Sequence, residues 1–151
     1  LTSSFDCLAV GYGAWLAGLT LVSLPHPARG VAPDEYVGHL EAMCSLADAR
    51  LIVIDPAYRS LLPETNLEVV DFDGYKSASF GSRHSLPGSG YGGFVQFTSG
   101  STSDPKGVVL SLDALGAAIE ATVEALEPRE HEAGVSWLPL SHDMGFIGVC
   151  L

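Results

Sequence analysis

Residues 31–55 restrict the fold of this chain more than any other stretch. They read VAPDEYVGHLEAMCSLADARLIVID, in which a helical pattern leads directly into a short strand. Pro33 and Asp34 are typical of the first turn of a helix. Apolar side chains then recur on one helical face, at Tyr36, Leu40, Met43 and Ala47. Residues 51–54 are all apolar, as in a strand buried on both faces, so the stretch predicts an α/β fold.

An uncharged run precedes this stretch, from Cys7 to Leu24. Its length is at the lower limit for a membrane-spanning helix. However, no basic cluster flanks the run, three glycines interrupt it, and its end, LTLVSLP, resembles a strand. We therefore predict a buried helix followed by a strand, and no membrane span. Beyond the opening stretch, a short helix is expected at residues 57–62 and a strand in NLEVVDF, residues 66–72.

The C-terminal third continues the alternation of helices and strands. Ser111 can cap a helix with an apolar stripe formed by Leu112, Leu115, Ile119, Val123 and Leu126. The solvent side of that helix carries Glu120, Glu124 and Glu127. Val135 and Trp137 then predict a strand that turns at Pro139, with a further helix after Asp143.

Composition and charge exclude several classes of protein. With 151 residues, 47% of them hydrophobic, the chain is predicted to form a globular unit with a real core, although its ends fall in mid-pattern, as in a fragment. Eighteen acidic against seven basic residues give a net charge of −11, which disfavours nucleic acid as a partner. The three cysteines are far apart and lack CxxC spacing, so we expect a reducing, cytoplasmic location.

Residues 73–93 lose the apolar pattern and collect glycine, serine and proline, which predicts an internal connecting loop. Gly88, Gly90 and Gly93 have GxGxxG spacing there. A dinucleotide site would need a strand before these glycines and a helix after them, and the sequence predicts neither. We therefore interpret the match as incidental.

The stretch FVQFTSGSTSDPKGVVLS, residues 94–111, places a polar loop between two apolar runs. Five hydroxyl side chains fall within residues 98–103, Gly100 permits a tight backbone, and Lys106 adds a positive charge. Hydroxyls, backbone N–H groups and an ammonium can bind several phosphate oxygens at once, so the loop predicts a polyphosphate site. The spacing does not fit GxxxxGK[ST], because Pro105 and Gly107 occupy the wrong positions. A serine-rich hairpin linker is the structural alternative.

Two motifs then resemble one enzyme family. FTSGSTSDPKGV is similar to the phosphate-binding signature of the adenylate-forming superfamily, which includes acyl-CoA synthetases, nonribosomal peptide adenylation domains and fatty-acyl-AMP ligases. SWLPLSHDMGFIG, residues 136–148, resembles the next superfamily motif in its fatty-acyl-AMP ligase form, and AWLAGLTLVSLPHPARG is similar to the family's early helix and strand. The resemblance implies that residues 1–151 are part of the large N-terminal adenylation domain, without the small C-terminal domain.

The resemblance also implies a two-step reaction. A carboxylate, in this branch a fatty acid, attacks the α-phosphate of Mg²⁺-ATP and releases pyrophosphate. The acyl group then passes from the acyl-adenylate to a thiol, either the phosphopantetheine of an acyl carrier protein or CoA. Acyl-CoA synthetases and amino-acid adenylation domains remain alternatives, as does a noncatalytic remnant that binds nucleotide only weakly.

The site residues follow from the same resemblance. The β and γ phosphates of ATP are expected to contact Thr98, Ser99, Gly100, Ser101, Thr102 and Lys106. Gly107 is expected to turn the chain into the next strand, and Thr102 to lie near the Mg²⁺. His142 matches the position between nucleotide and acyl pocket that admits the carboxylate. We interpret Asp143 as a helix N-cap. Core or acyl-pocket wall is the interpretation for Trp137, Met144 and Phe146.

Three positions depart from the family pattern. Ser103 replaces a common glycine, Leu112 replaces a common histidine, and Ser141 replaces a common aromatic residue. None of the three removes the phosphate-binding groups. Because the expected adenine, ribose and lysine motifs of the family lie beyond Leu151, we predict that the 151 residues alone do not form acyl-adenylate.

Overall fold

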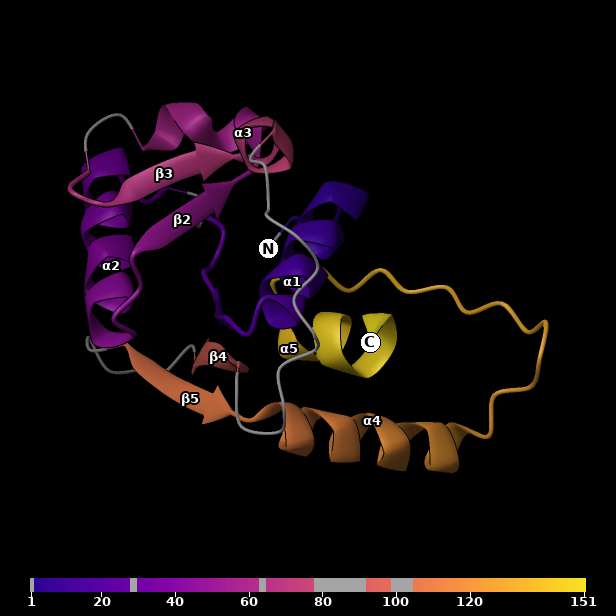
Figure 1. Ribbon diagram of the computed structural model, residues 1–151. Coiled ribbons are helices and arrows are strands. Elements are labelled where there is room, and N and C mark those ends of the chain that lie inside the picture. Colours follow the sequence, from indigo (N-terminus) through magenta and orange to yellow (C-terminus); the bar gives the residue numbers. More distant parts are fainter. Residues whose placement is uncertain (1, 28–29, 63–64, 78–91, 99–104) are drawn as a thin grey trace.

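The computed structural model describes residues 2–27, 30–62, 65–77, 92–98 and 105–151, and its strands form two small sheets. One sheet has the order β1 (Thr20–Ser23), β4 (Gly93–Thr98), β5 (Lys106–Leu110). The other pairs β2 (Leu51–Ile54) with β3 (Glu68–Asp71). β1 is parallel to β4 and β2 to β3, whereas β4 and β5 form an antiparallel hairpin. The α/β fold predicted from the sequence is confirmed (Figure 1).

Two helices supply most of the apolar cover of these sheets. α1 (Phe5–Leu16) begins at the N-cap Ser4, whose hydroxyl accepts a hydrogen bond from the Cys7 amide at 3.2 Å. α2 (Pro33–Leu46) has proline in its first turn, as the sequence predicts. The uncharged N-terminal run is thus a helix followed by β1, as expected. Within the described part of the chain, no helix combines the length and apolar character that crossing a membrane requires.

The remaining elements are short, apart from one. A 3₁₀ helix, η1 (Pro56–Leu61), connects β2 to β3, and α3 (Phe72–Ser77) follows β3. α3 occupies the first residues of the stretch that we predicted to be a loop, because the buried Phe72 anchors its first turn to the core. Residues 78–91, including Gly88 and Gly90, lie outside the described part of the chain.

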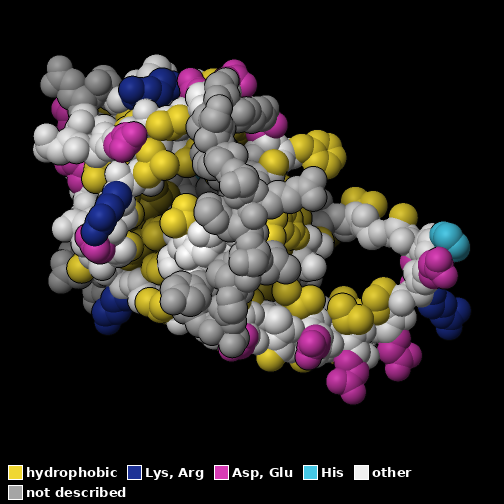
Figure 2. Space-filling model, in the orientation of Figure 1, with side chains coloured by type: hydrophobic (Ala, Val, Ile, Leu, Met, Phe, Trp, Pro, Cys, Tyr) yellow, Lys and Arg dark blue, Asp and Glu magenta, His cyan; other side chains and the backbone are white. Residues whose placement is uncertain are grey.

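The long helix α4 (Leu112–Leu126) begins where the sequence predicts, with the Ser111 hydroxyl accepting from the Ala114 amide at 3.1 Å. Glu120, Glu124 and Glu127 are on the solvent side, and acidic side chains gather along the outer side of this helix in Figure 2. The predicted apolar stripe packs only at its start. Leu115 is buried, but Leu126 is 71% exposed.

The strand predicted at Val135 and Trp137 is absent. Residues 133–139 have no regular structure, and Trp137 is 91% exposed, so its assignment to the core is wrong for this chain. A strand needs a neighbouring strand edge for its backbone, and none of the described strands pairs with this segment. The helix expected after Asp143 is present as α5 (Asp143–Gly145) continued by the π-helical turn η2 (Phe146–Cys150).

Candidate functional site

The β4–β5 hairpin brings the two described ends of the polar loop together. Thr98 and Lys106 are cross-strand partners in the last pair of the ladder, and the backbone register is continuous from there to Phe94 and Leu110. Thr98 Oγ1 lies 3.5 Å from the Lys106 carbonyl oxygen, which is long for a hydrogen bond, so the hydroxyl remains available to another acceptor. Thr98 and Lys106 form the end of the hairpin next to the polar loop, here called the hairpin mouth, and Thr98 is exposed there.

Four predicted phosphate ligands, Ser99, Gly100, Ser101 and Thr102, lie outside the described residues. Their roles, including that of Thr102 near Mg²⁺, therefore stay predictions. What the structure describes is the frame of the loop, which a two-stranded ladder fixes on both sides.

Gly107 has a different role from the predicted one. It is the second residue of β5 and pairs with Phe97, so it does not turn the chain into that strand. A Cβ at this position would lie 3.1 Å from Val95 Cγ1 and 3.3 Å from Phe97 Cε1. Glycine therefore fits here because the Phe97 ring lies directly over the backbone.

His142 precedes α5 and occupies its N-cap position, which the sequence analysis assigned to Asp143. The Nδ1 atom of His142 lies 2.7 Å from Asp143 Oδ1, a separation that requires a proton on Nδ1. The Met144 amide then donates to Asp143 Oδ1, at 2.7 Å, and its 3.3 Å contact with His142 Nδ1 is secondary. Asp143 is thus the first helical residue, and its contact with Nδ1 orients the ring.

The turn that carries His142 is attached firmly to the sheet. The His142 amide donates to the Pro139 carbonyl at 3.0 Å, and a Cβ at Gly145 would collide with the same carbonyl oxygen. Phe146 is 2% exposed, and its ring centroid lies 5.4 Å from that of Phe94 in β4. Of the three side chains assigned to core or pocket wall, Phe146 is buried, whereas Met144 is 61% exposed and Trp137 is exposed as described above.

Strand alternation places the hairpin mouth and the histidine on one face of the sheet. Phe94 packs against Phe146, and Thr98 lies four residues further along β4, so its side chain projects from the same face. Its cross-strand partner Lys106 shares that face. The structure therefore brings Thr98, Lys106 and His142 to one side of the three-stranded sheet.

Two polar residues on this face, Ser23 and Gln96, were not predicted as site residues. Ser23 and Gln96 are partners in the β1–β4 register, and Gln96 lies between Phe94 and Thr98 on the Thr98 face. Within the described residues, Ser23 Oγ and Gln96 Oε1 are buried and have no hydrogen-bond partner. A signal for Gln96 existed, since it is the single amide in the otherwise apolar run GFVQF. Ser23 could be found only once the strand register was known.

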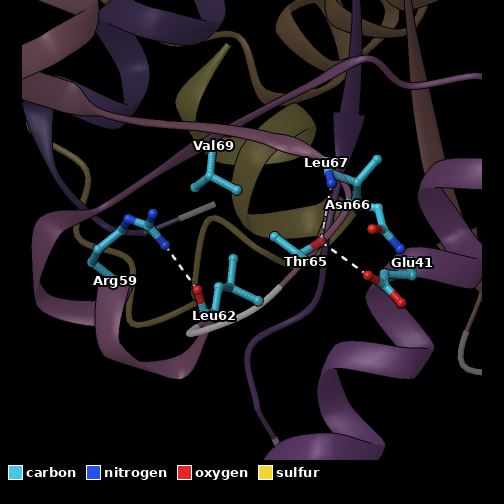
Figure 3. Close-up of a pocket in the computed structure, with 7 residues that line it drawn as sticks. All are labelled: Glu41, Arg59, Leu62, Thr65, Asn66, Leu67 and Val69. Carbon is cyan, nitrogen blue, oxygen red and sulfur yellow. Dashed lines mark hydrogen bonds between the residues drawn. The ribbon is translucent and has the colours of Figure 1, made fainter.

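Other polar features lie away from this face. A cavity of about 570 Å³ lies between α2, η1 and β3. Among its lining residues, Thr65 Oγ1 donates to Glu41 Oε1 at 3.0 Å and Arg59 Nη1 donates to the Leu62 carbonyl at 2.8 Å (Figure 3). These polar groups are paired with others of the same cavity. Burial raises the pKa of the Tyr36 phenol and the Cys44 thiol, but both belong to α2 rather than to the hairpin face.

Comparison with known proteins gives a consistent result. Residues 2–151 match the family described as AMP-binding enzyme. A Mycobacterium tuberculosis relative, named probable long-chain-fatty-acid–AMP ligase FadD30, is 29% identical over an alignment 157 positions long, which covers 94% of this chain. The alignment covers 26% of the relative, so the chain spans about a quarter of its length.

Two solved structures share the fold. One comes from a study of fatty acyl-adenylate ligases of E. coli and L. pneumophila, with a TM-score of 0.84, 23% identity, and coverage of 99% of this chain and 28% of the other. The second is o-succinylbenzoate CoA synthetase from Bacillus subtilis, in complex with ATP and magnesium ion. It has a TM-score of 0.73, 16% identity, and coverage of 97% of this chain and 38% of the other. At these identities, the structural likeness concerns the fold alone.

Proposed function

The chain belongs to the family of AMP-binding enzymes, and we propose that it contributes the phosphate-binding part of an enzyme that activates a fatty acid as its acyl-adenylate. The observation that carries this proposal is the joint placement of Thr98, Lys106 and His142 on one sheet face, with the hydroxyl-rich loop closed by the Thr98–Lys106 pair. The name of the M. tuberculosis relative supports the choice of a long-chain acid.

The chemistry of the hairpin mouth suits the first step. A carboxylate and a triphosphate are both anions, and negative charge grows on the pyrophosphate as it departs. The Lys106 ammonium can neutralise that charge, while hydroxyls from Thr98 to Thr102 donate to the phosphate oxygens. Fixed donors of this kind stabilise the transition state more than the ground state, because they are aimed where charge develops.

Mg²⁺ is proposed to enter this site bound to the phosphates of ATP. In the described part of the chain, no group of three or more histidine, cysteine, aspartate or glutamate side chains could hold a metal by itself. Mg²⁺ commonly keeps several waters and binds through nucleotide phosphates with few protein ligands. Thr102 is the proposed protein contact near the ion, which would supply charge neutralisation to the phosphates.

His142 is proposed to receive the carboxylate. Asp143 Oδ1 lies against Nδ1, and the His142 side chain is 61% exposed, so an acid can reach the ring from solvent. A carboxylate only accepts hydrogen bonds, so His142 would orient the incoming acid through an N–H at Nε2. In this role His142 is a positioning group for the acid rather than a nucleophile.

The second half-reaction is proposed to transfer the acyl group to a thiol. The phosphopantetheine of an acyl carrier protein is the preferred acceptor, because the HDMG motif resembles the fatty-acyl-AMP ligase branch. CoA is the alternative acceptor, and one of the solved structures that share the fold is a CoA synthetase. A cytoplasmic location completes the proposal, since the chain has no CxxC pair and its cysteines are free.

The decisive experiment measures fatty-acid-dependent ATP–pyrophosphate exchange by the full encoded enzyme and its Lys106 variants. Lys106→Ala should lower kcat/KM by about 100- to 1000-fold, as loss of one charge-stabilising group does, and Lys106→Arg should recover part of the loss. Arg50→Ala is the matched control, because Arg50 is also an exposed cation and its 4.0 Å contact with Asp48 is weak. Equal exchange rates in the Lys106→Ala and Arg50→Ala enzymes would refute the proposal.

A further inference from the structure

Strand β1 ends before β4 does. The β1–β4 ladder stops at the pair Ser23 and Gln96, whereas the β4–β5 ladder continues to Thr98. Among the described strands, the end of β4 therefore has a neighbour on the β5 side only. The Ser23–Gln96 pair is the last strand pair on the β1 side before the hydroxyl-rich loop.

The side chains of this pair project from one face of the sheet. Leu21 and Phe94 are the pair two residues earlier, and both pack in the cluster that contains Phe146. Because side chains alternate along a strand, Ser23 and Gln96 project from that same face. Neighbouring strands are about 4.8 Å apart, a separation that a glutamine side chain can bridge to a serine hydroxyl.

Each of the two side chains places a polar atom in a buried position. Ser23 is 2% exposed, so its hydroxyl is shielded from bulk water. Among the residues that the structure describes, Ser23 Oγ and Gln96 Oε1 are both buried, and neither has a hydrogen-bond partner. A buried polar atom without a partner is costly, so each atom needs one in the folded protein.

The two atoms have complementary requirements. An amide oxygen only accepts hydrogen bonds, whereas a serine hydroxyl can donate one. Gln96 Nε2 already donates to the Phe97 carbonyl at 3.3 Å, which leaves Oε1 as the end of the amide that needs a donor. Rotation about the Cα–Cβ bond of Ser23 moves its hydroxyl between staggered positions without a backbone shift. One hydrogen bond between the two side chains would therefore satisfy both atoms.

We propose that Ser23 and Gln96 form a buried hydrogen-bond relay that positions the hydroxyl-rich loop for phosphate binding. In this relay the Ser23 hydroxyl donates to Gln96 Oε1, and Gln96 Nε2 donates to the Phe97 carbonyl. The inference rests on the proposed function of the hairpin mouth and adds two residues to it. Both are positioning residues, since they act through the backbone of β4 rather than by contact with ATP or the acid.

The relay acts on the peptide that joins Phe97 to Thr98. The carbonyl that accepts from Gln96 belongs to this peptide, and Thr98 is the first residue of the predicted phosphate loop. A displacement of the peptide would move the Thr98 hydroxyl and the start of the loop together. Displacing binding groups by about 1 Å can lower a rate by about 100-fold. His142 belongs to the turn before α5, so the reception of the acid should be unaffected.

The test measures Michaelis constants of the full encoded enzyme in fatty-acid-dependent ATP–pyrophosphate exchange. In the Ser23→Ala and Gln96→Met enzymes, KM for ATP and for pyrophosphate should rise about tenfold, while KM for the fatty acid should change by less than about twofold. Methionine is also unbranched and flexible, but it lacks the amide. A loss of stability alone would lower the fraction of active enzyme and leave every KM unchanged.

Val22→Ala is the matched control for such a loss of stability. Val22 precedes Ser23 in β1, and its side chain packs on the opposite face of the sheet, with Met43 and Val95. The substitution should lower the unfolding temperature of the enzyme through lost packing. Its KM values for ATP, pyrophosphate and fatty acid should equal those of the unchanged enzyme.

Two further comparisons isolate the hydrogen bond. In the Gln96→Met enzyme, adding Ser23→Ala should not raise KM for pyrophosphate further, because the relay is already broken. Ser23→Thr should keep KM for pyrophosphate low and Ser23→Val should raise it, since the two side chains have similar shapes and only threonine has a hydroxyl. A crystal structure of the full encoded enzyme should place Ser23 Oγ within about 3.0 Å of Gln96 Oε1.

Several results would overturn the inference. Additive effects of Ser23→Ala and Gln96→Met would mean that the two residues act separately. Equal KM values for pyrophosphate in the Ser23→Thr and Ser23→Val enzymes would show that the hydroxyl is not required. A crystal structure in which Gln96 Oε1 accepts from another group would exclude the relay. If Lys106→Ala abolishes exchange while the Ser23 and Gln96 variants keep every KM, this inference fails and the proposed function stands.

Discussion

The helices α2 and α4 have similar sequence patterns but different surroundings. Both carry apolar residues at helical spacing, and both are predicted from that spacing. α2 buries Leu40, Met43 and Cys44 to 4% exposure or less, whereas α4 buries only Leu115 to that degree among its described residues. α2 spans two sheets, and α4 extends beyond the single sheet against which its start packs (Figure 1). Apolar spacing thus predicts a helix, while the extent of its burial depends on the surfaces beside it.

The same contrast occurs within the C-terminal motif. Trp137 and Phe146 both belong to SWLPLSHDMGFIG, but the first is 91% and the second 2% exposed. Phe146 has Phe94 and Trp15 within ring-contact distance, because η2 packs onto the β4 face. The segment of Trp137 has no described strand beside it. Substitutions at matched positions can therefore measure how far packing, rather than motif membership, determines stability.

The largest effect is expected at the two aromatic positions. Phe146→Ala in the 151-residue chain should lower the free energy of unfolding by about 3–5 kcal/mol, the usual cost of emptying a buried aromatic site. Trp137→Ala should change it by less than about 0.5 kcal/mol, because the side chain is already in solvent. Urea unfolding of the two variants decides the point. A comparable loss in the free energy of unfolding of the two variants would mean that Trp137 is packed in solution.

A smaller difference is expected between two glycines of the same region. Gly145→Ala should lower the free energy of unfolding by about 1–3 kcal/mol, because the added methyl collides with the Pro139 carbonyl that also accepts from His142. A methyl added at Gly134 would meet nothing within 4 Å beyond its chain neighbours, so Gly134→Ala should leave stability unchanged or raise it by less than about 1 kcal/mol. Thermal unfolding by circular dichroism compares the two, and a stable Gly145→Ala variant would show that the His142 turn is free to shift.

These contrasts explain what could be predicted from the sequence. The start of α4 at Ser111, the strand β2 and the two strands on either side of the polar loop depend on local patterns, and all are confirmed. The burial predicted for β2 is only partial, because Ile52 is buried but Leu51 is 43% exposed. The strand at Val135 depends on a neighbouring strand that is not among the described elements, so the local pattern was misleading there. Helix ends were predicted to within one residue at α5, where His142 rather than Asp143 is the N-cap.

The residues of the candidate site also differ in whether local sequence patterns could predict them. Thr98 and Lys106 could be predicted because the loop chemistry is contiguous in the sequence, and their pairing confirms that they close one loop. Gly107 was assigned to a turn because its neighbour Phe97 across the ladder was unknown, and that ring is the reason for a glycine there. Ser23 and Gln96 are far apart in the sequence and meet only through the parallel register. Such long-range pairs carry no local signal.

The smallest predicted effect compares the starts of α2 and α4. Ser111 caps α4 with its hydroxyl, so Ser111→Ala should lower the free energy of unfolding by about 1 kcal/mol. Ala32 occupies the N-cap of α2 in an extended conformation, with φ −67° and ψ 145°, and makes no side-chain cap bond. Ala32→Ser should therefore raise stability by up to about 1 kcal/mol, since the backbone already has the geometry that a capping serine uses. Urea midpoints that move in opposite directions would support this reasoning. A loss in both variants would show that α2 gains nothing from a cap because its packing across both sheets already fixes its first turn.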